Sequence, residues 1–410
     1  MTYQPESVWE FSIADNVTFG VGAVEEVSDA VAERGASSVL VVTDRGVAEA
    51  GVLDTVTDAL GDVEYAVFDE VDPDPSLDVF ENAVEVANES DPDAVVGVGG
   101  GSSMDVAKTT GIVAEHGGEV LDYVAPPTGG GEPVPGPGVP TVCLPTTAGT
   151  GSEVSPVSVI SLPDEDLKVG ISSPHQRPDV ALVDPALTVT LPPGPTASSG
   201  IDALSHAIEA YTTRRYDAKP APESRSDRPD YNGRSTLTDA LAHRAIELVG
   251  NNLRDAVDNG QDLEARRAMA LGSLLAGAAF TNAGVGATHA IAMAAGAIHH
   301  TPHGVTIALA MPAVMRFNAT SAPDRYAEIA DLLGEDLTAT GRHEAAEAAA
   351  RGVERLAADV GIDGGLSSLG LEPEDVDHVA ERASKLERLT VGNPRRIDRE
   401  DLESIVRDAI

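Results

Sequence analysis

The sequence predicts an α/β domain followed by an all-α domain. In the first half, short apolar runs alternate with amphipathic helical segments, which is typical of a parallel sheet covered by helices. After about residue 190 the strand-like runs disappear, and apolar residues recur at helical spacing. The turn TLPPGPTASSG at 190–200, rich in Pro, Gly and Ser, separates the halves. We therefore expect a parallel-sheet domain over residues 1–190 and a helical domain over residues 191–410.

The individual elements follow from the same patterns of apolar residues. The predicted strands are 37–44, 61–71, 93–101 and 141–147, and the predicted helices between them are 24–35, 47–60 and 77–90. In the second half the predicted helices include 203–213, 238–257, 263–280 and 324–334. Two segments that interrupt these patterns, 125–140 and 219–235, are predicted loops.

Length and composition exclude several classes of protein. With 410 residues, of which 42% are hydrophobic, the chain can bury two or three cores, which argues against global disorder despite a net charge of −40. No stretch reaches the roughly 18 apolar residues of a membrane span, and the N-terminus lacks the pattern of a signal peptide. Cys143, the only cysteine, excludes an intrachain disulfide. Since no basic cluster could neutralise phosphates, we expect a cytoplasmic protein without membrane or nucleic-acid partners.

The charged residues show a second feature. Only four of the 27 basic residues are lysines, and the 67 acidic residues are spread along the whole chain. Such an excess of acid makes the chain repel itself, and high salt screens that repulsion. The pattern favours a halophilic protein from a salt-rich cytoplasm over an ordinary acidic one.

A glycine-rich loop follows the third predicted strand. It includes Gly97, Gly99, Gly100, Gly101 and Ser102, and it opens a predicted helix. Glycines at such a place let backbone N–H groups approach a phosphate, and the helix N-terminus favours negative charge. The loop differs from the dinucleotide fingerprint G-x-G-x-x-G, because Ser102 stands at the last glycine. The alternative is a tight turn with Ser102 as the N-cap of the helix.

Two further features follow predicted strands. The segment 145–153, PTTAGTGSE, combines hydroxyls and glycines that can contact a cofactor, although a polar loop without a binding role has the same composition. Asp44 ends the first predicted strand, where an acidic side chain can bind an adenosine ribose and repel the 2′-phosphate of NADP. An ordinary aspartate at a strand end is the alternative for Asp44.

A group of four residues in the helical half suits a metal. Asp202 and His206, in GIDALSHAIEAY, are four residues apart and share one face of a helix. His289 and His303 lie in the segments THAIAM and TPHG. One carboxylate and three imidazoles suit a divalent transition metal and leave a position for a substrate oxygen.

Alternatives stay open for these histidines. A lone buried histidine is more often a hydrogen-bonded core residue than a ligand. His299 and His300 are close to the TPHG segment and compete with His303 for the fourth place. The pair His343-Glu344 lacks the second histidine of a zincin and is discarded.

Together these motifs resemble those of the iron-containing (group III) alcohol dehydrogenase family, over residues 12–405. VGVGGGSSMDVAK is similar to the family's GGGSxxDxAK cofactor motif, PTTAGTGSE to its second nucleotide-binding motif, and GIDALSHAIEAY, THAIAM and TPHG to its metal motifs. The resemblance implies a Rossmann-like dinucleotide-binding domain, a helical metal-binding and catalytic domain of the dehydroquinate synthase-like architecture, and a metal in the cleft between them. It also implies NAD and a divalent metal, Fe²⁺ or Zn²⁺, as cofactors.

The resemblance further assigns roles to individual residues. The implied metal ligands, which are also the implied catalytic residues, are Asp202, His206, His289 and His303. The implied cofactor contacts are Asp44, Gly99, Gly100, Gly101, Ser102, Asp105, Thr146, Thr147 and Lys168.

Within the family, some stretches resemble the hydroxyacid–oxoacid transhydrogenase branch, among them 121–134 and 262–285. Two departures point the other way. Many dehydrogenases of the family have a further histidine four residues after the third ligand and the transhydrogenases an aromatic residue, whereas this chain has Met293. The stretch from His289 to His303 is also short, as in the dehydrogenases.

We therefore expect an NAD-dependent, metal-containing alcohol dehydrogenase that transfers a hydride between a short alcohol or hydroxyacid and NAD and forms a homo-oligomer. The first alternative is a hydroxyacid–oxoacid transhydrogenase that uses 4-hydroxybutyrate and 2-oxoglutarate. A dehydroquinate synthase-like lyase shares the architecture, but the metal motifs argue against it. A catalytically inactive binding protein is a third alternative, against which the intact ligands argue.

Activity and folding are expected to need molar salt. Forty excess negative charges repel one another, and screening and bound cations relieve that repulsion. Between about 0.1 M and about 3 M KCl the Debye length falls from about 10 Å to below 3 Å. The midpoint of thermal unfolding should rise over this range, and an unchanged midpoint would contradict the halophilic interpretation.

Overall fold

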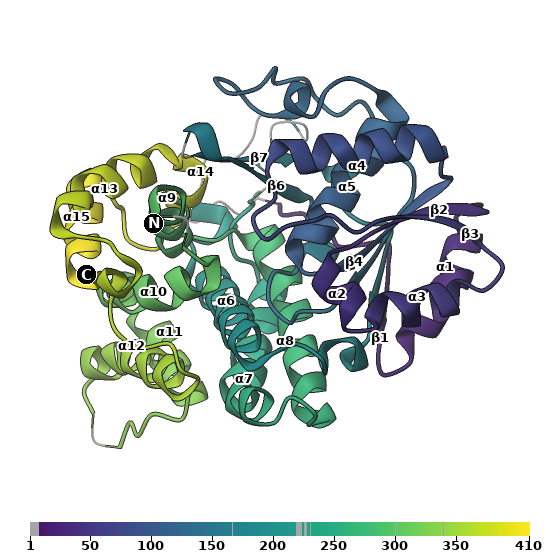
Figure 1. Cartoon of the computed structure of the whole chain (residues 1–410). Coiled ribbons are helices and arrows are strands. Elements are labelled where there is room, and N and C mark those ends of the chain that lie inside the picture. The colour runs from purple at the N-terminus through teal and green to yellow at the C-terminus, as the bar shows by residue number, and fades with distance from the viewer. Residues whose placement is uncertain are drawn as a thin grey trace. The chain divides into compact units, whose positions relative to one another are not determined.

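A computed structural model of the chain divides into two compact units (Figure 1). The residues described are 8–165, 167–218, 224, 228–229, 231–299, 301–338 and 340–410, with His299 described by its backbone alone. The α/β unit comprises Ile13–Leu191 and Gln261–Ala270. The helical unit comprises Met1–Ser12, Pro192–Gly260 and Leu271–Ile410.

The α/β unit is built on a six-stranded parallel sheet with the strand order β1-β8-β5-β4-β2-β3. The strands are β1 (Asn16–Phe19), β2 (Ser38–Val42), β3 (Glu64–Phe68), β4 (Ala94–Gly99), β5 (Thr141–Pro145) and β8 (Val180–Val183). An antiparallel hairpin of β6 (Val157–Leu162) and β7 (Leu167–Ser172) lies outside this sheet. The central strands β4 and β5 are buried along their whole length, as a sheet covered on both faces requires.

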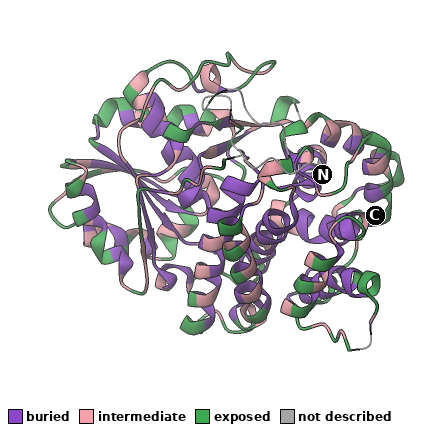
Figure 2. Cartoon of the chain, turned by 180° about the vertical axis from the view of Figure 1, so that it is seen from behind, coloured by how far each residue is buried: buried purple, intermediate pink, exposed green. Residues whose placement is uncertain are grey.

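Alternate residues of the strands enter two separate hydrophobic cores. In β2, Val39 and Val41 enter one core, and Leu40 and Val42 enter the other. Helices α1 and α3 close the first core, and α4 and α5 close the second. The helices of this unit are α1 (Val27–Glu33), α2 (Arg45–Glu49), α3 (Val52–Leu60), α4 (Leu77–Ser90) and α5 (Gly101–His116). Figure 2 shows buried strands between helices whose outer faces are exposed.

This architecture confirms the predicted fold class and adds detail that the sequence analysis does not contain. The predicted helix 47–60 is divided into α2 and α3 by Gly51, whose φ of 78° interrupts the helical backbone. Strands β1 and β8 have only four residues each, and β6 alternates buried and partly exposed residues, so none forms a long apolar run. These elements are therefore absent from the predicted set.

The helical unit is centred on the long helices α6 (Pro193–Thr212) and α10 (His303–Ala319). α6 packs along α7 (Thr236–Asp258) and α10, and α10 also contacts α9 (Ala287–His299), α12 (Arg342–Asp359) and α15 (Arg399–Ala409). The remaining bounds are α8 (Leu263–Ala283), α11 (Pro323–Leu332), α13 (Val376–Lys385) and α14 (Glu387–Thr390). From Gly200 to Thr212 every residue of α6 is buried, which makes it the central helix of the unit.

The compact units differ from the predicted domain limits in two segments. Ser12 exchanges two hydrogen bonds of 2.8 and 2.9 Å with Asn282, which holds the start of the described chain in the helical unit. Arg266 donates to the carbonyl oxygen of Leu191 at 2.9 Å, which holds the first turns of α8 in the α/β unit. Both contacts join residues far apart in sequence, and the composition of the chain gives no sign of them.

The predicted loop 125–140 contains no helix or strand, whereas most of the predicted loop 219–235 lies outside the described residues. Within the described residues, no single helix is long and apolar enough to cross a membrane. The bent pair Leu263–Ala283 and Ala287–Ile298, at 99°, meets that criterion only when its two members are taken together.

Candidate functional site

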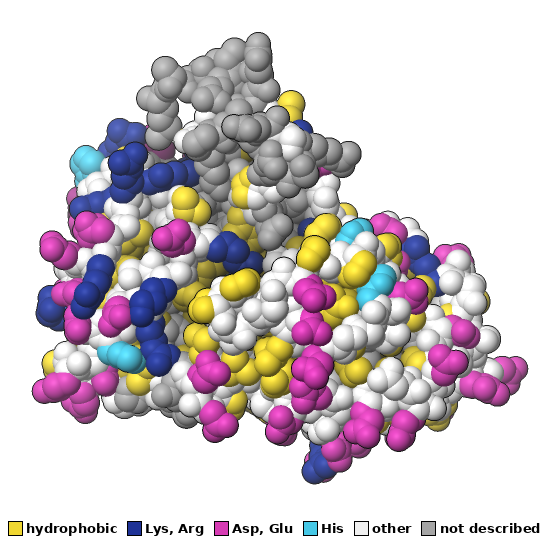
Figure 3. Space-filling view, turned by 90° about the horizontal axis from the view of Figure 1, so that it is seen from above, with side chains coloured by type: hydrophobic (Ala, Val, Ile, Leu, Met, Phe, Trp, Pro, Cys, Tyr) yellow, Lys and Arg dark blue, Asp and Glu magenta, His cyan; other side chains and the backbone are white. Residues whose placement is uncertain are grey.

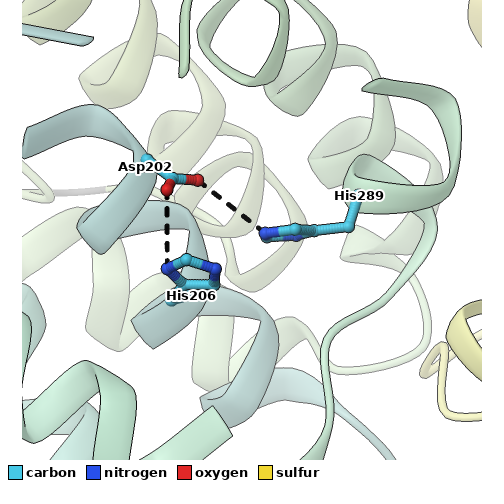
Figure 4. Close-up of side chains that lie close together, drawn as sticks. All are labelled: Asp202, His206 and His289. Carbon is cyan, nitrogen blue, oxygen red and sulfur yellow. Dashed lines mark ion pairs between the residues drawn. The ribbon is translucent and has the colours of Figure 1, made fainter. Parts of the chain in front are cut away.

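The four residues predicted as metal ligands lie in the helical unit, and the ligand atoms of three of them, Asp202, His206 and His289, all lie within 4.8 Å of one another. His303 is not part of that group, but it lies beside Asp202. α6 carries Asp202 and His206 one turn apart, so both face the same side of the helix. His289 lies in the first turn of α9, and His303 is the first residue of α10. Figure 4 shows the imidazoles of His206 and His289 facing the two oxygens of the Asp202 carboxylate. The three residues drawn there are all buried.

The distances between these side chains suit a shared metal ion. Oδ1 of Asp202 lies 3.8 Å from Nε2 of His289 and 3.7 Å from Nε2 of His303, and Oδ2 lies 3.9 Å from Nδ1 of His206. Distances this long are not hydrogen bonds. Metal–oxygen and metal–nitrogen bonds of about 2.0–2.2 Å set neighbouring ligand atoms about 3–4 Å apart, which agrees with the arrangement.

Two atoms of the predicted ligand set are buried without a hydrogen-bond partner among the described residues. They are Oδ1 of Asp202 and Nε2 of His289. Leaving a buried polar atom unpaired costs about 1–3 kcal/mol, and native proteins rarely do so. A carboxylate oxygen and an imidazole nitrogen with free lone pairs are donors that Fe²⁺ and Zn²⁺ accept. The residues therefore fit a bound divalent metal.

The electrostatics of the cluster also favour a cation. Burial raises the pKa of Asp202 to about 7, an effect that His289 opposes and Glu209 increases. Burial by itself lowers the pKa of His289, but the hydrogen bond to Glu209 and the charges of Glu209 and Asp202 raise it overall. A proton therefore competes with a metal for these ligand atoms, and a divalent cation stabilises the ionised form of Asp202.

The approach of α10 to α6 depends on Gly304. A Cβ atom at Gly304 would lie only 2.2 Å from the carbonyl oxygen of Ser198, so no side chain fits there. Ser198 lies one turn before Asp202 on α6, and His303 directly precedes Gly304. The close contact thus brings His303 beside Asp202, which explains why the TPHG segment has a glycine after its histidine.

Two further side chains at the cluster, Phe280 and Glu209, are not among the residues predicted from the sequence. The ring of Phe280, on α8, stacks on His206 with centroids 4.1 Å apart and an interplanar angle of 14°. Glu209 lies 2.6 Å from Nδ1 of His289. The spacing of Asp202, His206 and Glu209, at i, i+4 and i+7, is a signal for Glu209, whereas Phe280 is one apolar residue among many in its segment.

Met293, His299 and His300 are three further residues that bear on the sequence predictions for this site. Met293 is half-buried on α9, one turn after His289. Of the two histidines that compete with His303, His300 and the side chain of His299 lie outside the described residues.

Seven of the nine predicted cofactor residues lie at the carboxyl ends of adjacent strands in the α/β unit, whereas Asp105 lies within α5 and Lys168 on β7. Asp44 follows β2, the segment 99–102 ends β4 and begins α5, and Thr146 and Thr147 follow β5. The strand order reverses between β2 and β4, and open α/β sheets bind ligands at such a switch point. Asp44 and the two loops therefore occupy the part of this sheet where a dinucleotide is expected.

The glycine loop is closely packed against its neighbours. Gly99 has a φ of 150°, and a Cβ atom there would lie 2.5 Å from Oγ of Ser103. A Cβ atom on Gly101 would lie 2.8 Å from Cγ2 of Thr150. Ser103 in turn donates to Oδ2 of Asp44 at 3.4 Å. Only glycine fits at these two positions, and the loop lies directly beside Asp44.

The second loop contacts the first. The backbone N–H of Thr146 donates to the carbonyl oxygen of Gly99 at 2.9 Å. Oγ1 of Thr147 lies 3.7 Å from the Cβ position of Gly100, and it is buried without a hydrogen-bond partner in the described part of the chain. A polar atom of a bound cofactor would complete the hydrogen bonding of Thr147.

Two of the predicted cofactor residues are engaged with protein groups. Oδ1 of Asp105 accepts a hydrogen bond of 2.5 Å from Ser152 and lies 2.9 Å from Nζ of Lys108, and Oδ2 accepts from a backbone N–H of β6. Nζ of Lys168 lies 2.6 Å from Oδ1 of Asp74. The cofactor contacts of Asp105 and Lys168 stay predictions.

Comparisons with known proteins agree with the motifs. The family model described as iron-containing alcohol dehydrogenase matches residues 14–185. The model described as Fe-containing alcohol dehydrogenase family, C-terminal, matches residues 232–410. The two models together cover most of the chain.

Individual relatives are similar over nearly their whole length. An NAD-dependent methanol dehydrogenase from Bacillus methanolicus is 36% identical, with 98% of this chain and 99% of that protein aligned. A mitochondrial hydroxyacid-oxoacid transhydrogenase from Rattus norvegicus is 34% identical over 95% of this chain and 87% of that protein. A crystal structure of an archaeal halo-thermophilic Red Sea brine pool alcohol dehydrogenase, 29% identical, superimposes with a TM-score of 0.85 and full coverage of both chains. The chain therefore belongs to the iron-containing alcohol dehydrogenase family.

Proposed function

We propose that Asp202, His206, His289 and His303 hold the divalent metal, Fe²⁺ or Zn²⁺, of this NAD-dependent alcohol dehydrogenase. One observation carries the proposal: donor atoms from three helices converge, and two of them are buried without hydrogen-bond partners among the described residues. Imidazole and carboxylate ligands bind zinc more tightly than Fe²⁺, so the metal in purified protein reflects availability as well as affinity.

The metal, NAD and several residues of the site have separate roles in hydride transfer. When bound, the metal supplies Lewis-acid polarisation of the substrate oxygen, and NAD accepts the hydride. Phe280 fixes the plane of the His206 ring, and Gly304 lets His303 approach. Met293 has no ionisable group, so it cannot take the proton that the alcohol loses. That proton leaves through water or through a hydroxyl of the cofactor.

His206→Ala and His289→Ala should each abolish metal binding and turnover while the fold persists, because each removes one of four ligands. The measurements are metal content by mass spectrometry and helix content by circular dichroism. His378→Ala, which removes an exposed histidine on α13, is the control and should keep full metal content. Full occupancy and an unchanged rate in either ligand variant would remove that residue from the site.

We propose that the dinucleotide binds at the switch point of the sheet. Its phosphates would lie at Gly99, Gly100, Gly101 and Ser102, where α5 begins and its N-terminus favours negative charge. Support comes from the close packing of this loop and from the unpaired hydroxyl of Thr147.

Asp44→Ser should relax the preference for NAD over NADP. Asp44 lies beside the glycine loop, where its charge repels a 2′-phosphate. Its Oδ1 also caps α2 by accepting from the N–H of Val47 at 2.9 Å, and serine preserves that cap. The ratio of kcat/KM for NAD to that for NADP should fall about tenfold or more, a difference of about 1.4 kcal/mol. Asp58→Ser, at an exposed position on α3, should leave the ratio unchanged. A wild-type enzyme that uses NADP as well as NAD would contradict this role of Asp44.

We propose that the substrate is a short polar alcohol or a hydroxyacid such as 4-hydroxybutyrate. Relatives of both kinds, a methanol dehydrogenase and a hydroxyacid-oxoacid transhydrogenase, support this range. An acid substrate needs a nearby cation, and the candidates for it are Lys168, Arg214 and Arg215. Of these, Lys168 is paired with Asp74 and Arg215 with Asp217. Met293 and the short segment between His289 and His303 favour a dehydrogenase over a transhydrogenase.

The dehydrogenase should release NADH in each turnover. With NAD and a panel of alcohols and hydroxyacids, absorbance at 340 nm should therefore rise. With 4-hydroxybutyrate and 2-oxoglutarate but no added NAD, little 2-hydroxyglutarate should form, because no NAD stays bound between turnovers. Sustained formation of 2-hydroxyglutarate in that assay would establish the transhydrogenase instead. Oxidation of simple alcohols alone would exclude the acid substrate.

We further propose that the enzyme works as a homo-oligomer in a salt-rich cytoplasm, without nucleic-acid or membrane partners. The acidic surface supports the need for salt: on the face in Figure 3, acidic side chains are scattered widely, while Lys and Arg side chains gather toward one side. Similarity to a halo-thermophilic archaeal dehydrogenase also supports it.

A further inference from the structure

A buried glutamate lies directly behind the metal cluster. Glu209 is on α6, one turn after His206, and its exposed fraction is only 6%. Its carboxylate faces Nδ1 of His289, whereas Asp202 faces Nε2 of the same ring. Its role must therefore come from the groups that it contacts.

Three donors point at the Glu209 carboxylate. Oε1 accepts from the backbone N–H of Thr288 at 2.8 Å, and Oε2 accepts from the backbone N–H of Gly286 at 2.8 Å. Oε2 also lies 2.6 Å from Nδ1 of His289. A carboxylate can only accept, so Nδ1 of His289 carries a proton, and in the neutral imidazole Nε2 then keeps its lone pair. That Nε2 is the buried atom without a hydrogen-bond partner among the described residues.

The same carboxylate caps a second helix. α9 begins at Ala287, so the N–H groups of Gly286 and Thr288 lie at its N-terminus, where helices lack internal partners and favour negative charge. Glu209 therefore holds the start of α9 against α6. It also holds the imidazole of His289, which is the third residue of α9. A Cβ atom at Gly286 would lie 3.0 Å from Oε1 of Glu209, which leaves no room for a side chain there.

The surroundings keep Glu209 ionised. Burial acts to raise its pKa, but the hydrogen bonds from His289, Gly286 and Thr288 outweigh burial and lower the pKa overall. A small cavity with room for about one water molecule borders Glu209, and its lining includes the neutral polar residues Thr212 and Asn318.

We propose that Glu209 is a positioning residue of the metal site: it orients His289 with Nε2 toward the metal and thereby sets metal affinity. The inference rests on the proposed ligand set. Carboxylates that accept from the second nitrogen of a ligating histidine typically change metal affinity about 10- to 100-fold when removed.

Glutamine is the sharpest substitution. It has the size of glutamate, but its NH₂ group donates, and all three neighbours of Glu209 are donors. Whichever way the amide turns, one donor faces another. Glu209→Gln should therefore weaken binding of Co²⁺, measured by competition with a chelator, about 10- to 100-fold, and change the visible absorption of the Co²⁺-loaded protein.

Glu335→Gln is the matched control. Glu335 lies in the same unit, is partly buried and pairs with Arg355 at 2.7 Å. Its substitution should leave Co²⁺ affinity and absorption unchanged. A purely structural role of Glu209 would lower the unfolding midpoint of the metal-free protein without changing the Co²⁺ spectrum.

The outcomes separate the inference from the proposed ligand set. If wild type binds Co²⁺ and His289→Ala does not, the ligand set stands. Wild-type affinity and spectrum in Glu209→Gln would then overturn the positioning role. If Glu209→Gln fails to fold, Glu209→Asp tests the role, because aspartate keeps the charge but is one methylene shorter. Weaker Co²⁺ binding with a changed spectrum in Glu209→Asp would support the positioning role. Unchanged Co²⁺ binding would overturn it. If His289→Ala binds as tightly as wild type, the ligand set itself is wrong.

Discussion

The burial of the Asp202 carboxylate is the constraint on which the helical unit depends. A carboxylate so deeply buried is costly unless a cation or hydrogen bonds compensate it. Here the compensation comes from other segments of the chain: α9 and α10 each bring an imidazole to α6, and a glycine without a side chain lets α10 come close. The packing of these three helices is therefore coupled to the proposed metal site, and a metal bound there would contribute directly to the stability of the arrangement.

A second carboxylate changes the charge of the proposed site. Asp202 and a divalent metal alone would leave about one positive charge near the substrate oxygen. Glu209, ionised and bonded to His289, brings the local sum close to zero. A site with no net charge is less costly to bury, and the imidazole of His289 becomes a more basic metal ligand. The metal in such a site polarises the substrate oxygen less strongly. In the proposed arrangement the metal is therefore bound more tightly, but it is a weaker Lewis acid.

Local patterns predicted some features and missed others for physical reasons. The buried strands and the shared helix face of Asp202 and His206 can be predicted, because both depend on the hydropathy and spacing of residues that are close together in the sequence. The Phe280 stack and the contact of Gly304 with Ser198 join segments about 75 to 105 residues apart, and no local pattern encodes such pairs. Glu209 is the intermediate case, since its spacing from Asp202 and His206 was available but its partners on α9 were not. The edge strand β1 was missed because a half-exposed strand of four residues lacks an apolar run.

One lysine explains how the proposed cofactor loops keep their geometry in a chain that otherwise uses arginine. Lys108 on α5 is almost completely buried, and its ammonium lies 2.6–3.4 Å from three backbone carbonyl oxygens and 2.9 Å from Oδ1 of Asp105. A compact ammonium suits such a ring of oxygens better than a planar guanidinium. One of these carbonyls belongs to Ser152, in the second loop, and the other two belong to Ser155 and Val157, just after it. Lys108 therefore ties the helix after the glycine loop to the second loop. Salt screens exposed charges strongly and buried pairs weakly, so the salt that relieves surface repulsion leaves this contact intact.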